Sequence, residues 1–343
     1  MSHAAVENRT PFALEVLFLV DEDSRPLVVP VVKATFVIGR DGRCVRADEQ
    51  VPLNLAGLCF GPDPAAASYK FEPEVAFTKP TTDVVLIGHA YAARLDTKEM
   101  RVALTIASVS KEAVVYGDRL GGKTAGFFTM TRPLPFEKIP LIYERAFGGW
   151  DRSHADPSKH TYEPRNPVGT GFASADGAVK ELRLPNIEDP RTPFKNPGDR
   201  PAPAGFGFVS PHWQPRAALA GTYDEAWQKS RSPLLPRDFD RRHFNAASPG
   251  LVMPKYLHGD EPVSALGVTP DGTLNFSLPG VPPPEVTVAP LRGPDQNVSL
   301  ALDTIIIEPD ERRVFLIWRG NLALRTGPHD VGAIEVSSDF VRQ

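Results

Sequence analysis

Runs of apolar and β-branched residues, separated by short polar turns, dominate the N-terminal region of the chain, residues 8–131. Runs of this kind favour strands when they are short and end at Gly, Asp or Lys. The predicted strands cover residues 14–20, 28–38, 82–91, 101–108 and 113–116. The segment 21–26 supplies a turn, and Asp41-Gly42 is a hairpin signal. The region therefore predicts antiparallel β-structure that opens with a meander.

The middle region, residues 132–250, keeps neither the period of two that is typical of strands nor the period of 3.6 that is typical of helices. Pro, Gly, Asn, Asp, Arg and aromatic residues are mixed along it, so we predict long irregular backbone. Loops of such length commonly carry function. One short helix is expected over 225–231, with Asp224 as its N-cap and Pro233 after its end.

The C-terminal region, residues 251–324, returns to strand patterns, and the tail after Leu324 is expected to be loosely held. The predicted strands cover residues 274–278, 285–288, 298–308 and 313–318. We therefore predict a mainly β protein with few short helices. The N- and C-terminal strand regions would pack as an antiparallel, sandwich-like core, with the Pro/Gly-rich irregular middle laid over it. One large domain, 1–343, is the prediction, and two separable β domains are the alternative.

Composition narrows the class of protein. Proline and glycine account for 36 and 27 of the 343 residues, above a usual combined share of about 12 %, which leaves little room for long helices.

The formal net charge of −4 provides no field for gathering nucleic acid or anionic membrane lipid, so neither is an expected partner. Two cysteines without a CxxC spacing indicate a reducing compartment. With no signal peptide or spanning segment recognisable, the expected location is the cytoplasm.

The segment Gly117–Thr124 satisfies the phosphate-loop pattern letter by letter. That pattern binds phosphate because a helix begins at its lysine and directs backbone N–H groups at the anion. The residues after Lys123 are rich in Gly, Phe and Thr and end at Pro133, which does not favour a helix. We therefore interpret the segment as a glycine-rich turn between strands and predict no nucleotide and no other cofactor.

No catalytic or metal-binding residues are predicted. His154 and His160 lie six residues apart without a further ligand at metal-site spacing, and no nucleophile motif is present. Acidic residues do lie beside aromatic ones, as Asp151 does beside Trp150. A carbohydrate hydrolase would need two such carboxylates flanking one bond. The alternative function is therefore a β-sandwich enzyme that acts on carbohydrate or an envelope polymer.

A series of short motifs runs in order through nearly the whole chain. The motifs are Asn8–Phe12, Lys33–Phe36, Tyr116–Arg119, Pro133–Phe136, Pro140–Gly149, Arg165–Phe172, Leu184–Glu188, Gly221–Trp227, Leu235–Asp240, Leu302–Thr304 and Trp318–Gly320. Together they resemble the effector adaptors, or chaperones, of bacterial type VI secretion, a family that is also designated as the domain of unknown function DUF2169. Leu120 departs from the pattern, because an aromatic residue is expected soon after Gly117-Asp118-Arg119.

The resemblance implies a cytoplasmic, non-enzymatic role. Such an adaptor binds a secreted effector, often one with a PAAR-type tip domain, and helps to load it onto the VgrG-type spike. The resemblance does not supply a binding site, so we infer one from the density of arginine and aromatic residues in the irregular middle. The candidate partner-binding residues are Glu144, Arg145, Phe147, Trp150, Arg165, Trp213, Tyr223, Asp224 and Trp227.

Overall fold

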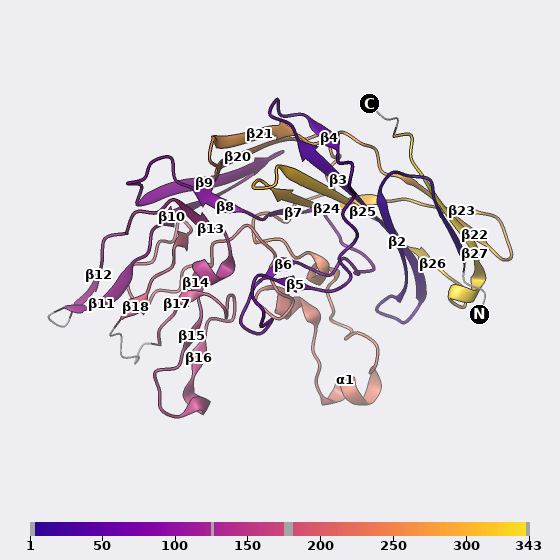
Figure 1. The fold of residues 1–343 in the computed structure, drawn as a ribbon. Helices are drawn as coiled ribbons and strands as arrows, with labels where there is room; N and C mark the ends of the chain where they lie inside the picture. The colour runs from indigo at the N-terminus through magenta and orange to yellow at the C-terminus, as the bar shows by residue number, and fades with distance from the viewer. Residues whose placement is uncertain (1–3, 125–126, 175–180, 341–343) are drawn as a thin grey trace.

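A seven-stranded sheet lies at the centre of the fold (Figure 1). The structure, a computed structural model, describes residues 4–124, 127–174 and 181–340. The strand order is β2 (Ala13–Val20), β3 (Pro26–Ile38), β25 (Arg313–Arg319), β24 (Ala301–Glu308) and β7 (Asp83–Leu86), and β4 (Cys44–Arg46) and β26 (Leu322–Ala323) also pair with β3. N- and C-terminal strands thus pair within one sheet, whereas the sequence analysis predicts only that the two regions pack together as a core. Its pairs are antiparallel except for β24 with β7, which is parallel.

Two further sheets flank this centre. The five-stranded sheet has the order β19 (Ile187–Glu188), β10 (Val109–Tyr116), β9 (Glu99–Ile106), β20 (Pro262–Thr269) and β21 (Gly272–Ser277). The four-stranded sheet has the order β1 (Ala5–Asn8), β27 (Val331–Ser337), β22 (Glu285–Pro290) and β23 (Gln296–Val298). Each sheet again combines strands from distant parts of the sequence. The mainly β fold class is therefore confirmed.

The remaining elements are short, and many of them lie in the middle region. The small sheets pair β11 (Leu120–Thr124) with β12 (Phe127–Met130) and β18 (Leu182–Arg183), β8 (His89–Tyr91) with β13 (Lys138–Pro140), β14 (Phe147–Gly148) with β17 (Thr170–Gly171), β15 (Trp150–Asp151) with β16 (Thr161–Tyr162), and β5 (Leu58–Cys59) with β6 (Tyr69–Phe71). The helical segments are α1 (Glu225–Ser230) and the 3₁₀ turns η1 (Tyr143–Arg145), η2 (Pro157–Lys159), η3 (Arg216–Ala220), η4 (Arg241–Phe244) and η5 (Pro328–Asp330). The glycine-rich segment with the phosphate-loop pattern lies largely within strand β11.

Strand β3 shows why the sequence forms this centre. Its thirteen residues are almost continuously apolar, and all but its two end regions are buried, because strands and packed side chains cover both of its faces. Phe36 and Trp318 of the adjacent β25 pack with Phe12 in one aromatic cluster. The same hydrophobic core continues into the middle region through residues such as Phe206. The irregular middle is therefore packed against the sheets.

The structure of the C-terminal tail differs from the prediction of the sequence analysis. It is not loosely held, because Val331–Ser337 forms β27 at an inner position of the four-stranded sheet, between β1 and β22. Ile334 and Val336 are buried, whereas Glu335 between them reaches Arg9 of the N-terminal segment at 2.6 Å. Alternation of apolar and polar residues over this short segment was the signal for a strand.

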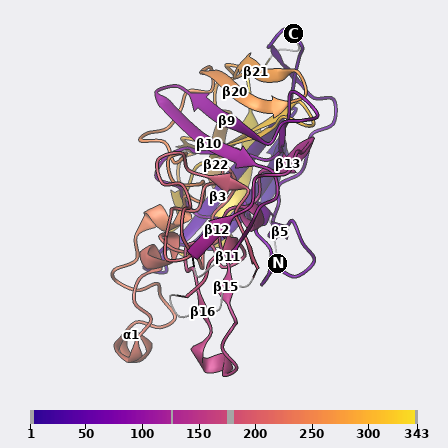
Figure 2. The same ribbon diagram turned by 90° about the vertical axis from the view of Figure 1, so that its left-hand side faces the viewer.

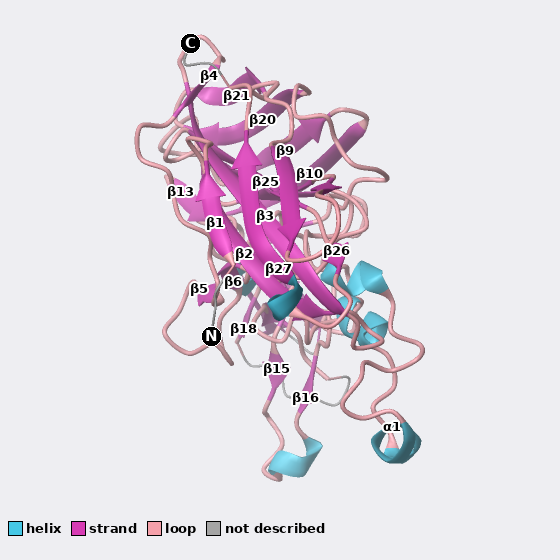
Figure 3. Ribbon diagram, turned by 90° about the vertical axis from the view of Figure 1, so that its right-hand side faces the viewer, coloured by secondary structure: helices cyan, strands magenta, loops and turns pink. Residues whose placement is uncertain are grey.

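Two extensions of the middle region project from the same side of the sheets, as three views show (Figure 1, Figure 2 and Figure 3). The first, residues 150–162, consists of β15, the turn η2 and β16. The second, residues 221–235, carries α1 at its outer end. We call them the hairpin arm and the helix arm.

Candidate partner-binding surface

The hairpin arm presents a stacked aromatic pair. Trp150 and Tyr162 lie opposite each other in the β15–β16 ladder, so their side chains lie on the same face. The ring centroids are 4.5 Å apart with an interplanar angle of 25°, and the residues are 44 % and 45 % exposed. The guanidinium of Arg152 lies 5.2 Å from the Trp150 ring centroid. Large rings that remain open to solvent in a fixed geometry are suited to anchor a protein partner.

Polar contacts hold the base of this arm. The carboxylate of Asp151 accepts hydrogen bonds from the backbone N–H of Ser153 at 2.9 Å and of Ser174 at 2.7 Å, and from the Ser174 hydroxyl. Burial opposes its ionisation, but these hydrogen bonds prevail and lower the pKa of Asp151. After β16, Arg165 pairs with Glu163 at 2.6 Å and donates to the carbonyl of Pro201 at 3.1 Å. Arg165, a predicted contact residue, therefore braces the arm.

The helix arm presents a second aromatic pair. Asp224 has the predicted N-cap role, because its carboxylate accepts a hydrogen bond from the Trp227 backbone N–H at 2.8 Å. Tyr223 packs edge-on against Trp227 with ring centroids 4.8 Å apart, and Tyr223 is 53 % exposed. The indole N–H of Trp227 donates to the Leu234 carbonyl at 2.8 Å. The Trp227 side chain therefore makes its hydrogen bond within the helix arm, whereas the Tyr223 side chain is exposed to solvent.

Ion pairs connect the helix arm to the central sheet. Arg231 donates to the Glu22 carbonyl at 3.0 Å and to the Asp23 carboxylate at 2.8 Å, both in the β2–β3 turn. Beyond the arm, Arg241 on η4 pairs with the Glu22 carboxylate of the same turn at 2.6 Å. At the base of the arm, Asp238 accepts hydrogen bonds from the backbone N–H and the hydroxyl of Thr222. The arm is therefore fixed at several points, which limits the entropy that a partner would have to remove on binding.

The remaining predicted contact residues lie outside the arms. The Glu144 carboxylate accepts hydrogen bonds from the backbone N–H and the hydroxyl of Ser68, both at 2.7 Å. Arg145 reaches Asp118 at 3.2 Å and the Asn186 side-chain oxygen at 3.1 Å. Both side chains connect segments of the protein to one another. In this structure they serve the packing of the middle region.

Two of the predicted contact residues, Phe147 and Trp213, are buried in the structure. Phe147 is 1 % exposed and packs with Leu184 and Phe194 in a small hydrophobic cluster. Trp213 is 6 % exposed and packs edge-on against Tyr143 at 5.5 Å. Neither side chain is available to a partner, so their prediction as contact residues was wrong. Both anchor irregular backbone to the core.

Tyr162 was missed by the sequence analysis. It stands twelve residues after Trp150, and the intervening segment carries Asp156-Pro157, a turn signal. Reading 150–162 as a hairpin would have placed the two aromatic residues side by side.

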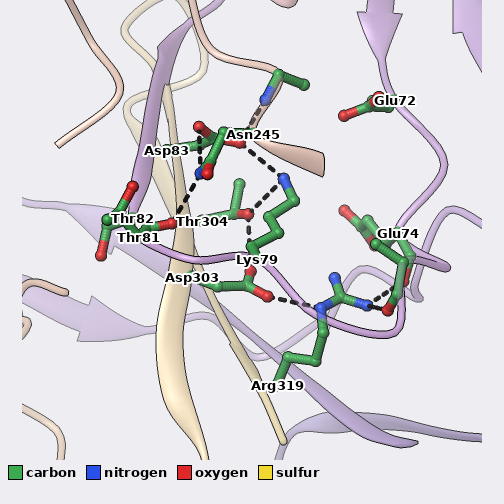
Figure 4. Close-up of polar contacts among 12 residues, drawn as sticks. Glu72, Glu74, Lys79, Thr81, Thr82, Asp83, Asn245, Asp303, Thr304 and Arg319 are labelled. Atoms are coloured by element: carbon green, nitrogen blue, oxygen red, sulfur yellow. Dashed lines mark hydrogen bonds and ion pairs between the residues drawn. The ribbon is translucent and has the colours of Figure 1, made fainter. Parts of the chain in front are cut away.

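A buried polar network beneath the middle region was also missed (Figure 4). Lys79 pairs with Asp83 at 2.8 Å and donates to the Thr304 hydroxyl at 3.1 Å. Asp83 also accepts from the Asn245 amide at 3.0 Å and from the Ala246 backbone N–H at 2.8 Å. Burial opposes the charge on Lys79, but Asp83 and other carboxylates prevail and raise its pKa. The network ties residues 79–83 and 245–246 to strand β24.

A second part of the network joins β25 to the segment before Lys79. Arg319 pairs with Asp303 at 2.6 Å and donates to the Glu74 and Ala76 carbonyls at 3.0 and 2.6 Å. The Glu74 carboxylate in turn pairs with Lys33 of β3 at 2.8 Å. Each of these charged groups has an oppositely charged partner, which offsets part of the cost of burial.

One cavity beside this network bears on the enzyme alternative. It measures about 220 Å³ and is lined by Glu72, Lys79, Arg216 and His243 among mostly apolar atoms. Burial raises the pKa of Glu72, against the opposing effect of its ion-pair partner Arg216, and burial lowers the pKa of His243. Glu72 is the one carboxylate that lines the cavity, whereas carbohydrate hydrolysis generally requires two. This cavity therefore lacks the pair of carboxylates that the alternative needs.

Metal-binding and membrane-spanning features were sought within the described ranges. In residues 4–124, 127–174 and 181–340, no three His, Cys, Asp or Glu side chains converge on a position that would hold a metal ion. None of the helices described there has the length and apolar composition required to cross a bilayer.

Comparison with known proteins gives one match. Residues 23–319 match the profile of a bacterial protein family that is described as "Uncharacterized protein conserved in bacteria (DUF2169)". No curated protein and no solved structure matches the chain. The matched segment includes both arms and the buried polar network.

Proposed function

The chain belongs to the DUF2169 family, and we propose that it is a cytoplasmic, non-enzymatic adaptor for a type VI secretion effector. In this proposal the adaptor binds an effector that carries a PAAR-type tip domain and helps to load it onto the VgrG-type spike. The observation that carries the proposal is the pair of arms with exposed aromatic side chains. The motif series through the chain supports the choice of client.

The arms suit a protein partner because of how their aromatic residues are held. Trp150 stacks on Tyr162, and Tyr223 packs on Trp227, so each exposed ring has a neighbour that limits its rotation. Aromatic anchors of this kind contribute about 2 kcal/mol or more each when a partner buries them. Their rigidity reduces the entropy lost on association. A partner that spans both arms would use two separate anchor points.

The effector must pass from the adaptor to the spike, and this transfer limits how tightly the adaptor can bind the effector. The proposal needs no ATP, because competition by the spike would release the client. A client bound too tightly would not leave, so we expect a dissociation constant of about 10⁻⁷ to 10⁻⁶ M, or roughly 8 to 9.5 kcal/mol. A picomolar complex that the spike fails to displace would contradict this mechanism.

Affinity purification from the native cytoplasm tests the proposal. The tagged chain and a Trp150→Ala/Tyr223→Ala variant are compared, with Leu291→Ala as the matched control, since Leu291 is 67 % exposed and lies outside both arms. We chose Tyr223 because Trp227 also supports the arm through its indole N–H. Mass spectrometry should identify an effector with a PAAR-type domain in the wild-type and control samples and should show at least about tenfold less in the double variant.

Recovery of the wild-type chain alone, with the secretion genes expressed, would overturn the proposed function. Equal recovery of the effector by the folded double variant would leave the adaptor role in place but would remove the arms as its binding surface.

A further inference from the structure

Three polar groups converge at the boundary between the five-stranded sheet and the middle region. They are the amine of Lys111 on β10, the hydroxyl of Ser248 and the phenol of Tyr143 on η1. Lys111 Nζ is hydrogen-bonded to Ser248 Oγ and donates to the Pro249 carbonyl at 2.7 Å. The Tyr143 hydroxyl donates to Ser248 Oγ at 2.9 Å. These contacts join β10 and η1 to residues 248–249 of the middle region.

The hydrogens of this cluster indicate the protonation state of the amine. Ser248 is fully buried, and within the described ranges its Oγ contacts only Lys111 Nζ and the Tyr143 hydroxyl as hydrogen-bond partners. If Lys111 carried a full charge, its amine would donate to Oγ, and the single bond between the two hydroxyl groups would leave either the serine or the tyrosine hydrogen without an acceptor among these groups. A buried hydroxyl hydrogen without an acceptor is unfavourable. If Lys111 is neutral, Ser248 donates to its lone pair, Tyr143 donates to Ser248, and one amine hydrogen reaches the Pro249 carbonyl, so both hydroxyl hydrogens have acceptors.

The electrostatic surroundings agree. Burial lowers the pKa of Lys111 to about 7, and Arg191 adds to this effect while Asp189 opposes it. Burial also raises the pKa of Tyr143 to about 12, so the phenol keeps its proton as a donor. The other charged side chains near the amine are Glu112 and Arg165, which carry opposite charges. The site therefore holds a large uncharged fraction of this amine near neutral pH, where an ordinary lysine is almost wholly charged.

A cavity of about 140 Å³ gives access to this group. Lys111 and Tyr143 line it together with Ala202, Ala204, Val209 and Pro249. Its walls are more apolar than polar, and its size suits a molecule of a few heavy atoms. Ser248 does not line the cavity, so the lysine is the reactive group that a small molecule meets.

We propose that Lys111 is a nucleophilic amine and that this cavity takes a small carbonyl compound, such as a short aldehyde, which the amine binds covalently. The lone pair of the amine adds to the carbonyl carbon. The carbonyl oxygen then leaves as water with the two amine hydrogens, and a carbon–nitrogen double bond forms. The Tyr143–Ser248 hydroxyl pair is placed to pass a proton during this exchange.

Reductive labelling of the intact protein tests the proposal. The probe is propionaldehyde with cyanoborohydride at about pH 7, and the labelled peptides are quantified by mass spectrometry. An ordinary lysine has a pKa near 10.4, so fewer than about one in a thousand of its amines are neutral at this pH. Lys229, which is exposed and paired with Glu225, is the internal reference. Lys111 should be labelled at least about tenfold faster than Lys229.

A matched variant tests the role of the cavity. Ala202 is exposed and lines the cavity, so Ala202→Trp should obstruct access without disturbing the core. It should slow the labelling of Lys111 at least about fivefold and leave that of Lys229 unchanged. Labelling of Lys111 in the wild-type chain at or below the rate of Lys229 would overturn the proposal. Unchanged labelling of Lys111 in the Ala202→Trp variant would overturn the assignment of this cavity as the site.

Discussion

In the central sheet, charged side chains are buried and paired, whereas in the two arms aromatic side chains are exposed. Lys33, Asp303 and Arg319 are each at most 5 % exposed, and each has an oppositely charged partner. Trp150 and Tyr223, in contrast, are 44 % and 53 % exposed. A chain of 343 residues with an extensive core has room to bury these rings. The inversion indicates that stability is concentrated in the sheets, and it supports our proposal that the arms bind a partner.

The strongest test of this contrast removes a buried charge. Arg319→Met deletes the partner of Asp303 and three hydrogen bonds, and it leaves the carboxylate buried and unpaired. We expect the free energy of unfolding to fall by about 3 to 5 kcal/mol. Lys229→Ala, which breaks an exposed pair in the helix arm, should change it by less than about 0.5 kcal/mol. Chemical denaturation measures the free energy of unfolding of both variants. Equal losses in the two variants would contradict the conclusion that stability is concentrated in the sheets.

The next prediction concerns how the free energy of unfolding changes with pH. It depends on Lys111, which lies at the boundary between the five-stranded sheet and the middle region. Burial lowers the pKa of Lys111 to about 7 in the folded protein, whereas a lysine of the unfolded chain has a pKa near 10.4. Between these values the unfolded chain binds more protons, so the free energy of unfolding should rise with pH.

The expected rise is up to about 1.4 kcal/mol per pH unit between about pH 7 and pH 8.5. Lys111→Met should remove this slope. The range stops below pH 9 because burial also raises the pKa of the Cys44 thiol to about 12, which has the opposite effect at higher pH. Denaturation at several pH values measures the slope, and a slope that persists in the variant would assign it to other groups.

A smaller effect is expected from the cap of the helix arm. Asp224→Ala removes the acceptor for the Trp227 backbone N–H and should destabilise α1 locally by about 1 kcal/mol. The global unfolding transition should move little, because the sheets do not depend on α1. Hydrogen exchange of residues 225–230 should accelerate by about fivefold. Asp224→Asn, which keeps a capping oxygen, is the control and should retain most of the protection.

The smallest effect on stability is expected from the aromatic anchors themselves. Trp150→Ala and Tyr223→Ala remove rings that are already half exposed, so each should change the free energy of unfolding by less than about 1 kcal/mol. Thermal and chemical denaturation provide the measurement. A loss of several kcal/mol would show that the rings belong to the core.

The sequence predicts the sheets better than the arms, for a physical reason. The apolar run over 28–38 predicts a strand because its length and composition allow burial on both faces. Asp224 predicts the start of α1 because a cap is a local interaction. In irregular backbone, burial depends on contacts between distant segments. Phe147 is buried by Leu184 and Phe194, and no local pattern separates it from exposed Trp150.

The buried network could not be predicted for the same reason. Lys79 and Thr304 are 225 positions apart in sequence, and their contact exists only after β24 has paired with β7. The C-terminal strand β27 was within reach of sequence analysis, since Ile334 and Val336 alternate with polar Glu335. The short length of that pattern concealed it.

Hydrogen–deuterium exchange of the chain with and without the proposed PAAR-type effector tests the central claim most directly. The account predicts that the effector slows exchange in residues 150–162 and 221–235, the two arms, and leaves the four-stranded sheet of β1, β27, β22 and β23 unchanged. Protection confined to that sheet, with both arms exchanging as in the free protein, would contradict the account.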